Sequence, residues 1–101
     1  MANFHTITCC CSNGLGSSLM VCMNVRAVLS ELGITGIQVQ HVPLSEAMAH
    51  PKELYVVGLD IAPQMRRFPA VVVLRDLISR DELRRKLNQA FESKEEAFRI
   101  E

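Results

Sequence analysis

The chain has 101 residues, of which 49% are apolar, and this is enough for a single domain with a buried core. Eleven Lys and Arg balance eleven Asp and Glu, and the aromatic residues are one Tyr and four Phe. Such a chain lacks the basic excess and the stacking platforms that bind nucleic acids. It also has no apolar run near the ~18 residues that span a membrane and no signal-peptide pattern. We therefore expect a cytoplasmic protein with one domain over residues 1–101.

The four cysteines indicate a reducing compartment. Cys9, Cys10 and Cys11 are consecutive, and neighbours in sequence rarely have the geometry of a disulfide. The C-x2-C spacing of zinc ligands does not occur, and His5 would splay away from Cys9 on a strand. We therefore expect no metal site and predict that Cys9, Cys10 and Cys22 serve as core packing.

The first half of the chain predicts a strand, a helix, a second strand and a short helix. Residues 4–10 are rich in β-branched and apolar side chains, which is typical of a strand, and a Gly-rich loop follows. The next helix is expected to stop at Gly33. Its apolar face has helical spacing and consists of Val21, Val25, Val28 and Leu32. A second strand is predicted over 36–42 and a short helix over 44–50.

The second half predicts two more strands and a final helix. Residues 53–58 are expected to form a strand buried on both faces, and residues 69–74 a fourth strand, with an irregular stretch between them. Ser79 and Glu82 predict a capping box at the start of the last helix. The apolar stripe of that helix is Leu83, Leu87 and Phe91. The charged tail over 92–101 either extends the helix or frays.

This alternation of apolar strands and helices predicts an α/β fold with a parallel sheet covered on both faces. Right-handed crossovers favour a small flavodoxin-like domain of three layers. The expected sheet has four strands in the order 2-1-3-4.

The loop after the first strand carries the predicted chemistry, because ligands bind beyond the carboxyl ends of strands in such sheets. Gly14 and Gly16 allow successive N–H groups to turn inward, and the following helix adds its own N–H groups and dipole. Cys11, at the mouth of this loop, is the predicted nucleophile, since an electropositive turn stabilises a thiolate. The predicted phosphate-binding residues are Ser12, Asn13, Gly14, Leu15, Gly16, Ser17 and Ser18.

A missing arginine distinguishes this loop from that of a phosphatase. Cysteine phosphatases use the pattern C-x5-R, and Ser17 stands where that Arg would be. Without an Arg clamp, we expect hydrolysis of a phosphocysteine to be slow, which suits a carrier. Two alternatives remain open: a low-molecular-weight cysteine phosphatase, and a non-catalytic anion-binding module in which Cys11 is incidental.

The loop, CSNGLGSS over residues 11–18, resembles the active-site loop of enzyme IIB components of the sugar phosphotransferase system (PTS). The ascorbate and galactitol branch, with its C-G-x-G-x-G-[ST]-S pattern, is the most similar, and Ser12 replaces its usual first glycine. Residues 53–58 resemble the third strand of these proteins, whose fold is of the lactose/cellobiose type. Residues 72–79 resemble their final strand and the turn into the last helix.

The resemblance implies a four-stranded fold related to low-molecular-weight tyrosine phosphatases, and a phosphotransferase role. A phosphohistidine on a IIA partner would pass its phosphoryl group to Cys11, which would pass it to a sugar bound in the membrane component IIC. The resemblance implies no cofactor, and association with the membrane only through IIC.

Other residues are secondary candidates. Asp60 follows the third strand and is a candidate acid on the rim of the site. Arg66 and Arg67 are candidates for steering a partner. The histidines, His5, His41 and His50, are expected at the surface or at strand ends. The methionines Met20, Met23, Met48 and Met65 are predicted to fill the core.

Overall fold

Five parallel strands form one sheet in the computed structural model, which describes residues 4–11, 17–50, 52–93 and 98–101 but not the side chains of Cys11, Ser17 and Ser18. The order is β2-β1-β3-β4-β5, so the predicted α/β class and the 2-1-3-4 arrangement are confirmed. The predicted count of four strands is wrong by one. The strands are β1 (Thr6–Cys11), β2 (Gln38–Pro43), β3 (Glu53–Gly58), β4 (Ala70–Leu74) and β5 (Phe98–Ile100).

The additional strand, β5, comes from the charged tail. Its residues pair with Ala70, Val71 and Val72 of β4, and the Phe98 N–H donates to Pro69 O at 2.7 Å. The Phe98 ring also packs edge-on against Phe4, with the ring centroids 6.0 Å apart. The sheet edge therefore recruits a segment of only three residues, which is too short to be recognised as a strand from its sequence.

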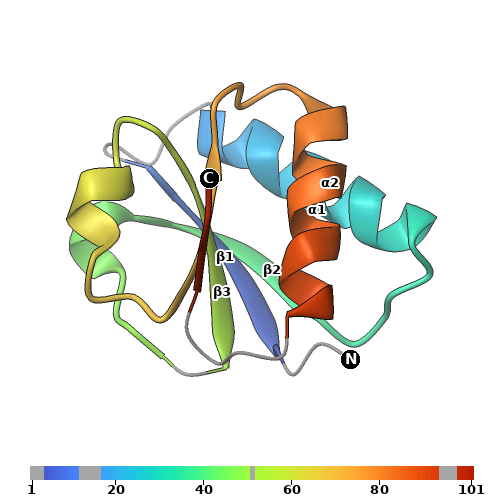
Figure 1. Ribbon diagram of the computed structural model, residues 1–101, viewed down its shortest axis with the longest axis horizontal. Helices are drawn as coiled ribbons and strands as arrows, with labels where there is room; N and C mark the ends of the chain where they lie inside the picture. The colour runs from blue at the N-terminus through green and yellow to red at the C-terminus, as the bar shows by residue number, and fades with distance from the viewer. Residues whose placement is uncertain (1–3, 12–16, 51, 94–97) are drawn as a thin grey trace.

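The two α-helices, α1 (Ser17–Glu31) and α2 (Arg80–Glu92), lie on one side of the sheet (Figure 1). The opposite face is covered by two 3₁₀ helices, η1 (Leu44–Glu46) and η2 (Ala62–Met65). This gives the three layers that the alternation predicted. The expected helix over 44–50 is reduced to η1, because Pro43 and the extended backbone at Ala47 limit it to one turn.

Helix α1 ends as the sequence predicted. Gly33 has φ +72°, a left-handed conformation that glycine adopts without steric cost. The Ile34 N–H donates to Leu29 O at 2.9 Å and the Gly33 N–H donates to Ser30 O at 3.1 Å, which is the Schellman pattern of helix ends. The chain then turns back to enter β2.

The core has two parts, one on each face of the sheet. Under the helices, the hydrophobic core includes Val25, Val28, Leu83 and Leu87, so the predicted helix stripes are confirmed. The 3₁₀ face has a smaller core that includes Cys10, Tyr55, Val57, Met65 and Val73. A buried Thr8 also lies on this face, and its Oγ1 accepts a hydrogen bond from Nε2 of the half-buried Gln40 at 3.0 Å.

The predicted capping box at the start of α2 is half correct. Ser79 Oγ accepts the Glu82 N–H at 3.2 Å, as expected. The Glu82 carboxylate, however, does not return to the Ser79 N–H, which donates to Asp76 O instead. Glu82 is buried and turns toward the end of β4.

The methionine prediction is mostly wrong. Met65 is fully buried, but Met20, Met23 and Met48 are exposed by 48%, 65% and 80%. The three exposed side chains are therefore available for contacts outside the domain.

Candidate functional site

The carboxyl ends of the strands form one edge of the sheet, and the strand order marks a position on it. From β1 the chain crosses to β2 on the helix face, and from β2 it returns to β3, on the other side of β1, by way of η1. The direction of the connections therefore reverses beside β1. In open parallel sheets, ligand sites form at this reversal, beyond the carboxyl ends of the strands.

The predicted nucleophile and its loop begin at this position. Cys11 is the last residue of β1, and its backbone lies opposite Pro43 of β2. Ser17 and Ser18 are the first two residues of α1. Ser12, Asn13, Gly14, Leu15 and Gly16 lie outside the described residues.

The first turns of the two α-helices differ in charge. The first turn of α2 contains Asp81 and Glu82, which complement the positive end of the helix dipole. The first turn of α1 contains no acidic residue. The positive end of α1 is thus not matched by a carboxylate of its own first turn, and it faces the edge where β1 ends.

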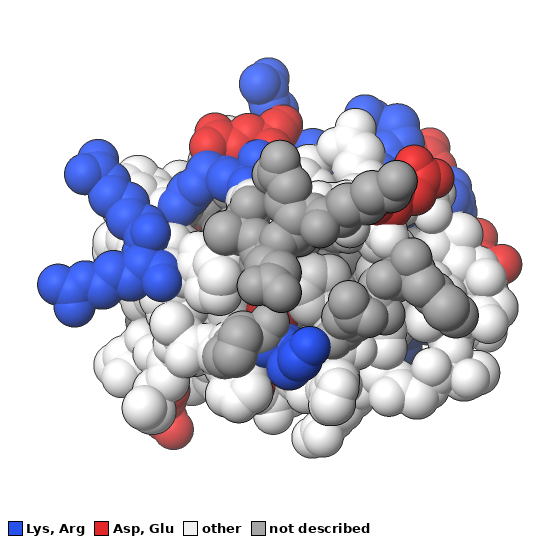
Figure 2. All heavy atoms as spheres, turned by 60° about the horizontal axis from the view of Figure 1, so that its bottom comes forward, with Lys and Arg blue, Asp and Glu red and all other residues white. Residues whose placement is uncertain are grey.

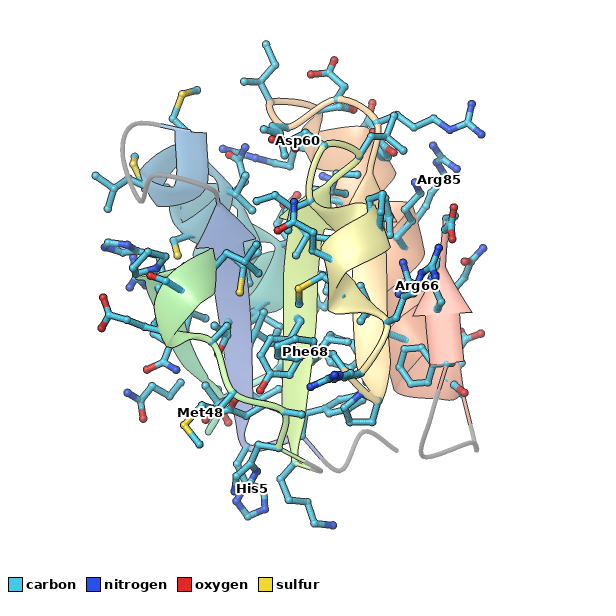
Figure 3. The ribbon with its side chains drawn as sticks, turned by 90° about the vertical axis from the view of Figure 1, so that its left-hand side faces the viewer. His5, Met48, Asp60, Arg66, Phe68 and Arg85 are labelled. Carbon is cyan, nitrogen blue, oxygen red and sulfur yellow. The ribbon has the colours of Figure 1, made fainter. Side chains whose placement is uncertain are left out.

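Asp60 lies at the same edge, as predicted, just beyond β3 (Figure 3). A Cβ at position 58 would stand 2.8 Å from Asp60 Oδ1 and 3.2 Å from Leu77 Cδ2. Glycine at the end of β3 therefore lets the Asp60 carboxylate and the Leu77 side chain close over the strand.

A buried ion pair, which sequence reasoning missed, holds the carboxyl end of β4. Glu82 Oε2 lies 2.6 Å from Lys86 Nζ, which also donates to Val73 O at 2.7 Å. The Glu82 carboxylate accepts the N–H groups of Arg75 at 2.7 Å and Asp76 at 2.9 Å. Both side chains are more than nine-tenths buried. The i, i+4 spacing was visible in the sequence, but it usually marks an exposed pair.

The ionisation of Glu82 follows from these contacts. Burial by itself disfavours the charged carboxylate and would raise its pKa. The Arg75 N–H, the Lys86 ammonium and the Asp76 N–H outweigh burial and lower the pKa of Glu82 to about 2. At neutral pH Glu82 is therefore a carboxylate, and it is this charged form that binds the N–H groups at the end of β4.

Exposed apolar side chains gather near the carboxyl edge. Leu19, Met20 and Met23 lie on the first two turns of α1, Leu59 follows β3, and Ile78 precedes α2. We call these five residues the apolar rim. Among the described residues, the remaining large apolar side chain with such exposure is Met48, which lies toward the amino edge (Figure 3).

The candidate steering residues lie elsewhere. Arg66 and Arg67 directly follow η2 and are exposed, and Figure 2 shows Lys and Arg side chains projecting on the side where η2 lies. Figure 3 places Arg66 lower on the 3₁₀ face than Asp60, away from the carboxyl edge. Arg66 and Arg99 line an open hollow of about 550 Å³ between η2 and β5.

A comparison with known protein families covers most of the chain, including the segments that form the carboxyl edge. A family model described as PTS system, lactose/cellobiose specific IIB subunit, matches residues 6–89, from the start of β1 into the last turns of α2. The chain belongs to this IIB family. No curated protein matches the chain. The predicted IIB membership is confirmed, whereas the matching model is of the lactose/cellobiose group and not the ascorbate and galactitol branch.

Membership makes the protein a IIB component of a sugar phosphotransferase system, a phosphocarrier that works with IIA and IIC components. The matched range includes Cys11, residues 12–16 and the start of α1. In the part of the chain that the structure describes, no helix is both long and apolar enough to cross a membrane.

Proposed function

We propose that this IIB subunit carries its phosphoryl group on Cys11. The supporting observation is the place of Cys11 in the fold: it ends the strand at which the chain connections reverse, inside the range that the IIB family model matches. A covalent carrier needs an exposed edge that a partner can reach, and the carboxyl edge offers one. The phosphate-binding residues are Ser12 to Ser18, and Asp60 stands on the rim.

The transfer consists of two displacements. A phosphohistidine of IIA loses its P–N bond as the Cys11 sulfur forms a P–S bond. The P–S bond then breaks as a hydroxyl of the sugar held by IIC forms a P–O bond and releases its proton. The N–H groups of the loop and of the first turn of α1 stabilise the phosphoryl oxygens, and no acidic residue of that turn opposes them.

The apolar rim supports a role in docking. Partner surfaces bury apolar and Met side chains at their centre, and the rim residues lie at the start of α1 and in the segments that follow β3 and β4. We propose that IIA and IIC approach this edge in turn, since both must reach the same sulfur. The domain then works on the cytoplasmic side of the membrane and associates with it through IIC.

The test is a reconstituted relay. The protein is incubated with phosphoenolpyruvate, enzyme I, the small histidine carrier and a cognate IIA, and its intact mass is measured. We expect one added phosphoryl group on the wild type and on Cys10→Ser, and none on Cys11→Ser. Cys10 is a matched control because it is adjacent and buried.

A second assay separates the carrier from a phosphatase. We expect no sustained turnover of an aryl phosphate, since Ser17 replaces the arginine of C-x5-R enzymes. Turnover that disappears with Cys11→Ser would replace the carrier with a phosphatase. An unlabelled wild type, in the presence of phosphorylated IIA, would remove the proposal.

A further inference from the structure

Two thiols connect β1 to α1 just behind the carboxyl edge. Cys9 lies on β1 and Cys22 on the second turn of α1, and each is only 1% exposed. Both belong to the core under the helices, and their side chains share a hydrogen bond. Sequence reasoning treated them as separate packing residues, and the fold brings them together as a pair.

The neighbouring Cys10 is not part of this pair. Side chains alternate between the two faces of a strand, and Cys10 packs on the 3₁₀ face with Tyr55 and Val57. The sheet itself therefore separates Cys10 from Cys22. Within the described side chains, the thiol that faces Cys22 is that of Cys9.

We propose that Cys9 and Cys22 are a redox modification site, which a hydroperoxide oxidises to an intramolecular disulfide between β1 and α1. Cys9 precedes Cys11 by two residues and Cys22 follows Ser17 by one turn. The bond would therefore tie together the two elements that flank residues 12–16. The modification does not depend on Cys11 carrying phosphate.

The environment distinguishes the roles of the two sulfurs. The hydrogen bond from Cys9 lowers the pKa of Cys22 against the effect of burial, and the Arg26 guanidinium on the next turn acts in the same direction. The same hydrogen bond, together with burial, raises the pKa of Cys9. Of the two, Cys22 is thus the sulfur that loses its proton more readily and attacks, and Cys9 is the one that resolves.

The oxidation balances with one hydroperoxide. The Cys22 thiolate attacks an oxygen of the peroxide, so that an S–O bond forms and the O–O bond breaks. The departing oxygen takes a proton and leaves as water, or as an alcohol from an organic peroxide. The Cys9 sulfur then attacks Cys22, the S–S bond forms, the S–O bond breaks, and the hydroxide leaves as water with the Cys9 proton. The two thiols lose two electrons, which the peroxide accepts.

Burial sets the rate. Because both sulfurs are covered, peroxide reaches them only when the first turns of α1 separate from β1. We therefore expect this oxidation to be slower than that of an exposed thiol, and to accelerate when the helix start is loosened by mild denaturant.

The test uses two matched double variants, each with two of the four thiols. Cys10→Ser/Cys11→Ser keeps Cys9 and Cys22, and Cys9→Ser/Cys10→Ser keeps Cys11 and Cys22. Each is treated with hydrogen peroxide and then alkylated. Cleavage after Leu15 and Leu19 with chymotrypsin, which does not need an unoxidised methionine, separates Cys22 from the other cysteines, so a disulfide is read as linked fragments. Circular dichroism and thermal melting first establish that the reduced variants fold like the wild type.

We expect the first variant to lose two hydrogen atoms, to give linked fragments from monomeric protein, and to recover its mass with dithiothreitol. The second variant should give no intramolecular link. Linked fragments from the second variant at an equal or higher rate would overturn the proposal, as would sulfinic acid without a link in the first. Should a variant not fold, the wild type is oxidised and mapped by tandem mass spectrometry, where a Cys9–Cys22 link supports the proposal and any other link overturns it.

Discussion

The two edges of the sheet are built differently. At the amino edge, backbone groups join neighbouring segments: the His5 N–H donates to Lys52 O, the Gln38 N–H to His5 O, and the Phe98 N–H to Pro69 O. Polar side chains such as His5 and Lys52 are exposed there. The amino edge is therefore closed mainly by backbone hydrogen bonds.

At the carboxyl edge, side chains rather than backbone groups hold the strand ends. The Glu82 carboxylate and the Lys86 ammonium hold the end of β4, and Leu77 closes over the end of β3. Five large apolar side chains are exposed near this edge. The amino edge is thus held by backbone hydrogen bonds, whereas the carboxyl edge combines a buried ion pair with the exposed apolar rim that we propose as the docking surface.

The largest expected effect is on the support of the carboxyl edge. Glu82→Ala leaves the Lys86 ammonium buried without its partner, and we expect the free energy of unfolding to fall by about 3–5 kcal/mol. Urea denaturation measures it. The control is Glu31→Ala, which removes a half-exposed partner of Arg84 near the amino edge and should have a far smaller effect. Equal losses would contradict the assigned difference between the edges.

The same carboxylate predicts a pH dependence. The pKa of Glu82 is lowered in the folded state to about 2, against about 4.3 for an unperturbed Glu. Its stabilising contribution is complete above the unfolded value and is lost as the pH falls from about 4.3 to about 2. Denaturation curves across this window should therefore decline more steeply for the wild type than for Glu82→Gln. Parallel declines would show that the carboxylate does not hold β4.

A smaller effect is expected from the apolar rim. Met23→Ser and Ile78→Ser remove contact area near the carboxyl edge, and each should raise the KM for phosphorylated IIA about three- to tenfold with little change in kcat. Met48→Ser is the matched control, because Met48 is the most exposed of the methionines that the structure describes and lies toward the amino edge. If the Met48 variant slows transfer as much as the rim variants, docking is not confined to the carboxyl edge.

The smallest effect concerns the amino half of β3. Tyr55 is fully buried. Its hydroxyl donates to Met48 O and lies 2.5 Å from Glu53 Oε2. Tyr55→Phe should cost about 1 kcal/mol of stability, the net value of a typical hydrogen bond, and leave transfer from IIA unchanged. Thermal melting and the relay assay measure the two quantities. A transfer defect without loss of stability would move function toward the amino edge.

The sequence was informative where local pattern and global fold agree. The run Glu53–Gly58 has no polar interruption after its first residue, so a strand buried on both faces was predictable and is observed. Ser79 and the stripe ending at Phe91 likewise defined α2. β5 was missed because a run of three residues is too short to indicate a strand, and only the pairing with β4 makes it one.

The site was predictable in location and less so in its surroundings. The position of Cys11 at the carboxyl edge followed from a strand that ends in a Gly-rich turn. The apolar rim was not predictable. The residues from Leu19 to Met23 are apolar on every side of the helix, so the sequence does not indicate which of them are buried. The burial of Glu82 and Lys86 also depends on tertiary contacts with β4, which the helix sequence does not contain.

The most direct test of the central claim is the phosphorus NMR spectrum of the protein after transfer from phosphorylated IIA. The account predicts one protein-bound resonance in the phosphothiol region, present in Cys10→Ser and absent in Cys11→Ser. A resonance typical of phosphohistidine, or a phosphothiol resonance that persists in folded Cys11→Ser, would contradict it.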